Sequence, residues 1–155
     1  MSGPDRGLDN VDATRGPTAS QAAGMTLAAA RRMIDAVEGV ARELRVALSV
    51  AVVDAGDQLV AFARMDGADL VSIELATNKA FSALVNRMPT RDLGPVVQPG
   101  TEFYGYDSLA GGRMVVFAGG MPLERDGVLV GAVGVSGGSS KEDQRAADAA
   151  VAAFG

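Results

Sequence analysis

Apolar positions along the chain recur first at helical spacing and then at strand spacing. Thr26 precedes apolar residues that repeat every three or four positions, which predicts a helix to about Glu43 with Thr26 as its N-cap. Two apolar runs follow, at residues 47–53 and 58–63, and an Asp- and Gly-containing turn at 54–57 separates them. This pattern is typical of an antiparallel hairpin.

The middle of the chain predicts a second helix and then a long loop. Residues 70–87 carry apolar side chains on one stripe, which indicates a helix, and Thr90 is placed to cap a further short turn through Val97. Residues 98–112 are rich in glycine and contain both tyrosines, so we expect a loop. Long loops in compact domains are often functional.

The last part of the chain predicts another hairpin and a final helix. Residues 114–117 predict a strand, 125–127 a turn and 128–135 a buried, glycine-containing strand. Ser139 begins a capping-box pattern that opens a helix to Phe154. The order of helix, hairpin, helix, hairpin and helix predicts an α+β domain, with helices packed on a mainly antiparallel sheet of about four or five strands.

The first 24 residues differ in composition from the remainder. They are polar and rich in Gly, Pro, Ser, Thr and Asp, which predicts a disordered leader before one domain at residues 25–155. They lack a basic segment followed by an apolar one, and no apolar run of the chain approaches the roughly 20 residues of a membrane span. We therefore expect a cytoplasmic protein without a membrane partner.

Composition excludes several kinds of chemistry. The chain has no cysteine, which rules out disulfides, thiolate catalysis and cysteine metal sites. It has no histidine, which rules out a Ser-His-Asp triad, histidine acid–base catalysis and ordinary zinc sites. A net charge of −5 and the absence of tryptophan argue against a basic, aromatic-lined groove for nucleic acid.

Lys79 is the first candidate for chemistry. It and Lys141 are the lysines among 14 basic residues, and Lys79 lies in the predicted second helix, where there is little other charge. A lysine held among apolar groups favours its neutral form, which suits a base, a nucleophile or an anion ligand. The alternative is a lysine at the helix edge, with its stem packed and its ammonium in water.

Arg64 and Asp66 form the second candidate set, in the loop that leads into the Lys79 helix. An arginine there can clamp a carboxylate with two parallel hydrogen bonds. The alternative is an exposed Arg–Asp pair of little energetic worth. Asp54 belongs to the opposite end of the first hairpin and suits a turn-forming role, so we do not expect it to share a site with Arg64.

Aromatic residues and glycines supply a candidate binding site. The predicted loop at 98–106 carries three aromatic side chains, including Tyr104 and Tyr106, and Gly119 and Gly120 follow the next apolar run. Aromatic rings beside flexible backbone can wall a flat ligand. The alternative is an aromatic-packed surface loop or a contact between subunits.

Several of these segments together resemble the GlcG/HbpS-like family, whose members are known as heme-binding or heme-degrading proteins. The family is similar to the C-terminal domain of PduO-type adenosyltransferases. The resemblance covers about residues 25–155. The matching segments are Ser49–Asp54, Leu59–Gly67, Lys79–Ala83, Phe117–Leu123 and Gly127–Gly137.

The resemblance implies a profilin-like fold with a five-stranded sheet flanked by helices, and homo-oligomers from dimers to octamers. It also implies heme as a cofactor of some members, and a link of others to small-carboxylate pathways. Members that ligate heme through histidine differ from this chain, which has none. Thr101 is the nearest match to a threonine that some relatives use, and Tyr104, Tyr106 and Met121 are alternative iron ligands.

Three hypotheses of function follow. The first is a protein that binds heme or a similar small anionic ligand in an oligomer pocket. Its binding residues would be Thr101, Tyr104, Tyr106, Gly119 and Gly120. The second is a cofactor-free lyase, isomerase or cyclase acting on a carboxylate or carbonyl compound, with Lys79 as base or Schiff-base former, Arg64 as clamp and Asp66 as proton partner. The third is an accessory or assembly protein without catalysis.

Overall fold

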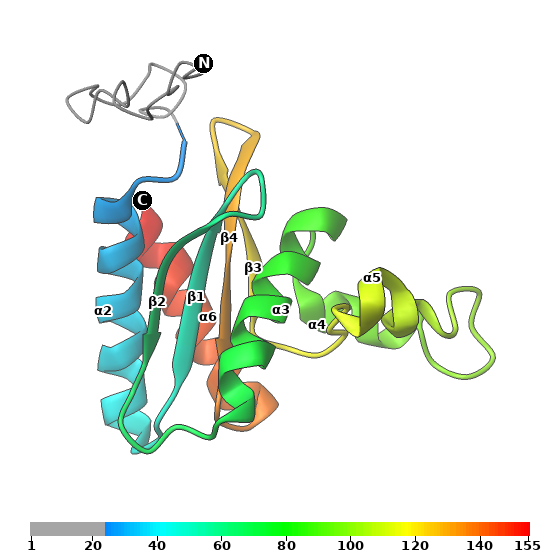
Figure 1. Cartoon of the computed structure of the whole chain (residues 1–155), viewed down its shortest axis with the longest axis horizontal. Helices are drawn as coiled ribbons and strands as arrows, with labels where there is room; N and C mark the ends of the chain where they lie inside the picture. Colours follow the sequence, from blue (N-terminus) through cyan, green and yellow to red (C-terminus); the bar gives the residue numbers. More distant parts are fainter. Residues whose placement is uncertain (1–23) are drawn as a thin grey trace, which may run out of the picture.

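The computed structural model describes residues 24–155, so the predicted leader lies outside the described residues except for Gly24. Helices and strands alternate along the chain in nearly the predicted order (Figure 1). The elements are α2 (Leu27–Leu44), β1 (Ser49–Asp54), β2 (Leu59–Arg64), α3 (Val71–Asn86), α4 (Thr90–Leu93), η1 (Gly94–Val96), η2 (Tyr106–Ser108), α5 (Leu109–Gly112), β3 (Gly120–Arg125), β4 (Val128–Ser136) and α6 (Ser140–Phe154).

The sheet has the strand order β2-β1-β4-β3, and every neighbouring pair is antiparallel. Ser49 of β1 pairs with Arg64 of β2 on one side and with Ser136 of β4 on the other. The predicted α+β class and antiparallel sheet are therefore confirmed. The expectation of five strands is wrong for the described residues, which form four.

The predicted strand at residues 114–117 is also wrong. Val115 is buried, but its backbone N–H donates to the side-chain oxygen of Ser82 on α3, at 2.8 Å, rather than to a neighbouring strand. The strand begins later, at Gly120, and contains Pro122, which the sheet accommodates because β3 is an edge strand. The predicted turn at 125–127 then joins β3 to β4.

Helices cover both faces of the sheet (Figure 1). Helices α2 and α6 lie side by side on one face, where Met33, Val37, Val50, Val133 and Phe154 belong to the main apolar cluster. Helix α3 covers the other face. None of the helices between residues 24 and 155 is long and apolar enough to cross a membrane.

Local signals fix the helix ends as predicted. The Thr26 side chain accepts a hydrogen bond from the backbone N–H of Ala29 at 3.1 Å, and thus caps α2. Ser139 and Glu142 form the predicted capping box at the start of α6. Such caps satisfy backbone N–H groups that the helix itself leaves without partners.

Helix α3 approaches the sheet closely because small residues face each other there. Gly134 of β4 has no room for a side chain, since a Cβ would collide with the backbone of Ala76 and Ala80 on α3. Ala80 and Ala83 belong to the small apolar cluster on this side, together with Ala132 of β4. This tight contact fixes the position of Lys79, which lies one residue before Ala80.

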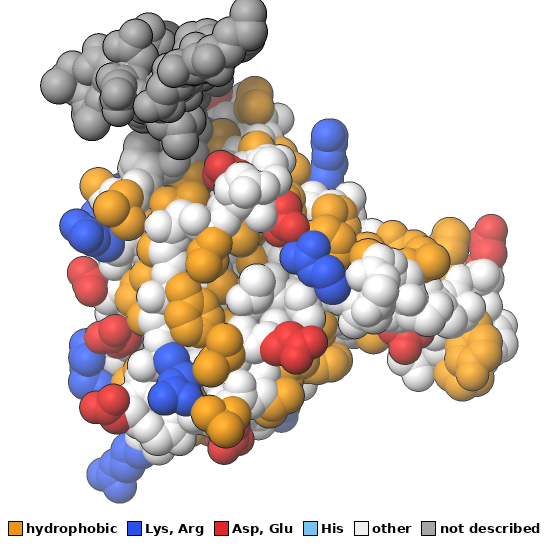
Figure 2. All heavy atoms as spheres, in the orientation of Figure 1, with side chains coloured by type: hydrophobic (Ala, Val, Ile, Leu, Met, Phe, Trp, Pro, Cys, Tyr) orange, Lys and Arg blue, Asp and Glu red, His pale blue; other side chains and the backbone are white. Residues whose placement is uncertain are grey.

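Residues 94–113 form a projection that we call the arm. It extends sideways from the body of the molecule, beyond α3 and α4 (Figure 1), and hydrophobic side chains lie along it (Figure 2). The region predicted as a loop thus contains short helical turns, at η2 and α5. Its returning end is fastened by Arg113, whose guanidinium stacks 3.8 Å from the Phe81 ring centroid and lies 3.0 Å from Asp57 Oδ2.

Candidate functional site

Lys79 lies at the centre of a buried polar cluster. Its side chain is 0% exposed, and its Nζ atom is 2.6 Å from Oδ2 of Asp143 in the first turns of α6. Nζ also donates to the backbone oxygen of Val135 at 2.9 Å and lies 3.5 Å from the Ser136 hydroxyl. The alternative of a lysine whose ammonium reaches water at the helix edge is wrong, because the whole side chain is enclosed.

Burial and pairing act against each other in this cluster. Loss of hydration lowers the pKa of Lys79 below its usual value, and the hydrogen bond and negative charge of Asp143 offset part of that effect. Burial likewise raises the pKa of the Asp143 carboxyl, and Lys79 together with the Gly138 N–H offsets part of it. The pair therefore links α3, α6 and the end of β4, with both charges removed from water.

Gly119 and Gly120 close this cluster from the side of β3. A Cβ on Gly119 would lie 2.5 Å from the Val135 oxygen and 2.9 Å from Lys79 Nζ, and Gly119 has a φ of +116°. A Cβ on Gly120 would collide with the backbone oxygen of Lys79. Both glycines are buried. The space where their side chains would lie is occupied by atoms of Lys79 and Val135.

Arg64 and Asp66 lie apart from the Lys79 cluster. Both are exposed, whereas Lys79 is enclosed. Arg64 is aligned with Ser136 across the sheet, with Ser49 between them. Their backbones are therefore two strand spacings apart, which is about 10 Å in total. As predicted, Asp54 has the turn role, because its Oδ1 accepts from the N–H groups of Gly56 and Gln58.

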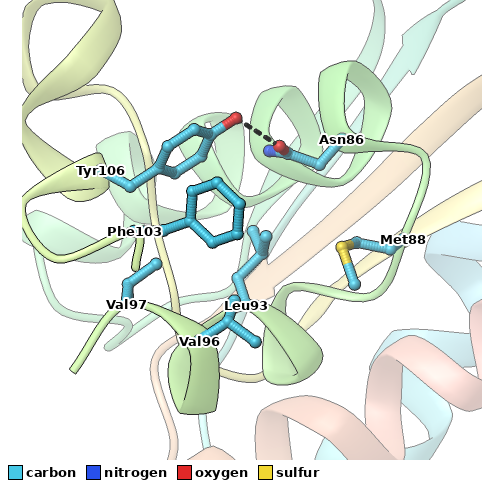
Figure 3. A pocket seen from close by; sticks show the side chains of 7 residues that line it. All are labelled: Asn86, Met88, Leu93, Val96, Val97, Phe103 and Tyr106. Atoms are coloured by element: carbon cyan, nitrogen blue, oxygen red, sulfur yellow. Dashed lines mark hydrogen bonds between the residues drawn. The ribbon is translucent and has the colours of Figure 1, made fainter. Parts of the chain in front are cut away.

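A separate cavity of about 190 Å³ lies where the arm meets the end of α3 (Figure 3). Its lining is apolar or aromatic apart from one amide and one phenol, and it contains no charged side chain. The rim is open to solvent, since Val96 is 42% and Phe103 52% exposed. The lining residues are Asn86, Met88, Leu93, Val96, Val97, Phe103 and Tyr106. We call this cavity the arm pocket.

One hydrogen bond joins the two walls of the arm pocket. The Tyr106 hydroxyl on η2 donates to Oδ1 of Asn86, at the end of α3, over 2.6 Å (Figure 3). Asn86 Nδ2 donates to the Ser82 carbonyl oxygen at 2.8 Å, and the Met114 sulfur is 3.5 Å away. The Phe103 and Tyr106 rings meet edge to face, with centroids 6.4 Å apart. The aromatic wall is therefore held in place by α3.

The other predicted heme-binding residues are arranged differently. The Thr101 hydroxyl lies 2.7 Å from the carbonyl oxygens of Val96 and Gln98, so it is engaged by the backbone of the arm. Tyr104 is 68% exposed and does not line the arm pocket. The Met121 sulfur accepts from the Gln144 amide at 3.2 Å, on the side of α6.

A whole heme does not fit within the arm pocket of one chain. The cavity is smaller than the roughly 300 Å³ at which pockets for drug-sized ligands begin. Two side chains of the lining, the Met88 thioether and the Tyr106 phenol, are of types that can bind iron. The Tyr106 hydroxyl, however, donates its hydrogen bond to Asn86. No cationic side chain of the lining is available for propionates, and residues 24–155 contain no acidic cluster suited to a metal ion.

Sequence reasoning anticipated Tyr106 and missed much of the rest. Asp143, the partner of Lys79, was not singled out, although it stands in the first turns of a helix whose inner face is otherwise mostly alanine. Asn86, Met88 and Leu93 carry no motif, and they become neighbours only when the arm folds back on α3. Phe103 belonged to the predicted aromatic loop.

Comparisons with known proteins agree with this fold. A family model described as "Haem degrading protein HbpS-like" matches residues 25–152. An uncharacterized 15.0 kDa protein from the dhaT-dhaS intergenic region of Citrobacter freundii is 40% identical over 134 residues, which is 86% of this chain and 94% of that protein.

Solved structures are similar as well. The Klebsiella pneumoniae protein ORFY has a TM-score of 0.84 and 38% identity, covering 91% of this chain and 97% of that one. The crystal structure of a PduOC–heme complex has a TM-score of 0.81 and 39% identity, covering 84% and 94%. The similarity therefore extends over most of this chain and of each relative.

Proposed function

The chain belongs to the HbpS-like family, and on this premise we propose that it binds heme or a similar small, largely apolar ligand at the arm pocket. The observation that carries the proposal is the open apolar cavity beside Phe103 and Tyr106. Asn86 and Leu93 of the lining lie on α3 and α4, and the hydrogen bond to Asn86 holds Tyr106, so this part of the cavity is already formed when a ligand enters.

Heme is the first ligand to test because a structural relative, PduOC, is solved as a heme complex. The arm pocket has room for an apolar edge of the macrocycle, and the remainder would lie over the exposed aromatic side chains of the arm. Anionic groups of such a ligand would remain outside the cavity, because the lining offers them no positive charge.

A titration that compares hemin with iron-free protoporphyrin tests this proposal. If apolar contacts in the arm pocket dominate binding, the affinities for hemin and protoporphyrin lie within about fivefold of each other, since the chain has no histidine or cysteine to bind the iron. Saturable spectral changes with both compounds support the proposal. Spectra that remain those of the free porphyrins at stoichiometric protein reject it.

We also propose that the chain forms a homo-oligomer with a profilin-like subunit, as the family resemblance implies. Exposed apolar side chains on the arm support an association of this kind. They are Val96, Phe103, Tyr104 and Leu109. A mass in solution measured by light scattering decides the point, and the mass of a single chain at micromolar concentration would contradict it.

The enzyme hypothesis remains a prediction that rests on Lys79. The geometry of Lys79 lends this hypothesis no specific support. Its ammonium is enclosed and is paired with Asp143, whereas Arg64 and Asp66 are exposed and lie elsewhere. Likewise, no observation favours the accessory or assembly role over ligand binding. Cytoplasmic location also remains a prediction.

A further inference from the structure

The arm pocket has features that restrict its ligand more narrowly than the proposed function does. Its volume of about 190 Å³ is close to that of an engineered apolar cavity of roughly 150 Å³ that binds benzene. A molecule with one aromatic ring or a small fused pair can therefore enter completely, whereas a macrocycle can insert only an edge.

The lining selects for a neutral and aromatic ligand. No charged side chain faces the cavity, so an ion entering it would lose hydration without a compensating partner. The Phe103 and Tyr106 rings offer aromatic contacts, and the Met88 thioether is a further favourable neighbour for a ring.

The polar atoms of the lining fix the direction of the hydrogen bond that a ligand can make. The hydrogen of the Tyr106 hydroxyl is already donated to Asn86, which leaves the phenol oxygen as an acceptor. The Asn86 amide nitrogen, which has two hydrogens, donates to the Ser82 carbonyl oxygen and to the Met114 sulfur. A ligand that donates a hydrogen bond is therefore matched at Tyr106, and a ligand that only accepts is not.

We infer that the arm pocket binds a small, neutral aromatic compound carrying one N–H or O–H donor, which donates to the Tyr106 phenol oxygen. This inference rests on the proposed function, because it assigns a ligand class to the same pocket. It differs from heme binding in placing the whole ligand inside the cavity of a single chain.

Indole and 1-methylindole form a suitable pair of probes. The chain has no tryptophan, so the fluorescence of the added indole can be followed directly. An apolar pocket without a usable acceptor prefers 1-methylindole, because the methyl group adds apolar area. The inference predicts the opposite order, with indole bound more tightly by about threefold or more, because 1-methylindole leaves the phenol oxygen without a donor and this cost exceeds the gain from its methyl group.

Two tyrosine variants provide the matched comparison. In Tyr106→Phe the preference for indole disappears or reverses, and in Tyr104→Phe it stays as in the wild type, since Tyr104 lies on the arm but outside the lining. The affinity for 1-methylindole reports whether Tyr106→Phe has kept the pocket's shape. If that affinity changes, the order of the two probes in the wild type decides.

The outcomes separate this inference from the proposed function. Tighter binding of indole in the wild type, lost in Tyr106→Phe, supports the inference. Equal or tighter binding of 1-methylindole overturns it. If neither indole binds but protoporphyrin does, the inference fails and the proposed function stands. If none of the three binds, both fail.

Discussion

Helix α3 carries two polar sites that differ in almost every physical respect. Lys79, near its middle, is charged, enclosed and paired with Asp143, whereas Asn86, at its end, is neutral and borders an open cavity. The first site is a buried ion pair that is closed to ligands from solvent. The second has weak individual interactions but offers accessible apolar surface. The buried pair joins α3 to α6, whereas the open cavity at the end of α3 is where we propose that a ligand binds.

Breaking the buried pair should have the largest effect. Lys79→Met leaves the Asp143 carboxylate buried without its partner, and we expect a loss of about 3–5 kcal/mol in the free energy of unfolding, measured by chemical denaturation. The double variant Lys79→Met/Asp143→Leu should recover most of that loss, because paired removal leaves no isolated charge. A single variant as stable as the wild type would show that the pair contributes nothing.

Filling the space beside the lysine should have the next largest effect. Gly119→Ala places a methyl group against the Val135 oxygen and Lys79 Nζ at a positive φ, so we expect a loss of about 1–3 kcal/mol. Gly39→Ala is the control, since the site is helical with nothing within 4 Å, and it should be neutral or stabilising. If Gly119→Ala leaves stability unchanged but weakens ligand binding, Gly119 belongs to the binding site, as the sequence predicted, and the packing role is contradicted.

The pH dependence of stability should show a smaller effect with a definite sign. Because burial raises the pKa of Asp143 above 3.8, the folded chain holds that proton more tightly than the unfolded chain does. Because burial lowers the pKa of Lys79 below 10.5, the folded chain releases that proton more readily. The pair's contribution to the free energy of unfolding thus rises as pH falls toward 3.8 and as it rises toward 10.5.

Denaturation curves of the wild type and the double variant across pH check this sign. Relative to the double variant, the wild type should be least stable between pH 3.8 and pH 10.5 and should gain stability toward either limit. If the wild type instead loses stability relative to the double variant toward both ends, the ion pair is stabilised overall in its charged form.

What the sequence predicted well depends on local interactions. The caps at Thr26 and Ser139 and the turn at Asp54 involve partners within four residues, and all three are present. The strand predicted at 114–117 failed because a strand requires a neighbouring strand, and there the backbone bonds to Ser82 instead.

The candidate sites depend on contacts between distant segments. Asp143 lies 64 residues from Lys79, so its role cannot be predicted from spacing along either helix. The arm pocket draws its lining from the end of α3, α4, η1 and η2, and its polar bond joins Asn86 to Tyr106 across 20 residues. Composition predicted an aromatic binding loop, and only folding shows which of its tyrosines faces the cavity.

The affinity of Val96→Trp for protoporphyrin tests the central claim most directly. Val96 lies on the exposed rim of the arm pocket, so a tryptophan there should obstruct the cavity with little change in stability. Val128→Trp, at an exposed hairpin position outside the lining, and the double variant Lys79→Met/Asp143→Leu are the controls. We predict that Val96→Trp weakens binding by about tenfold or more, roughly 1.4 kcal/mol, while both controls bind as the wild type does. Unchanged binding in Val96→Trp, with loss in the folded double variant, would contradict the account and move the binding site to Lys79.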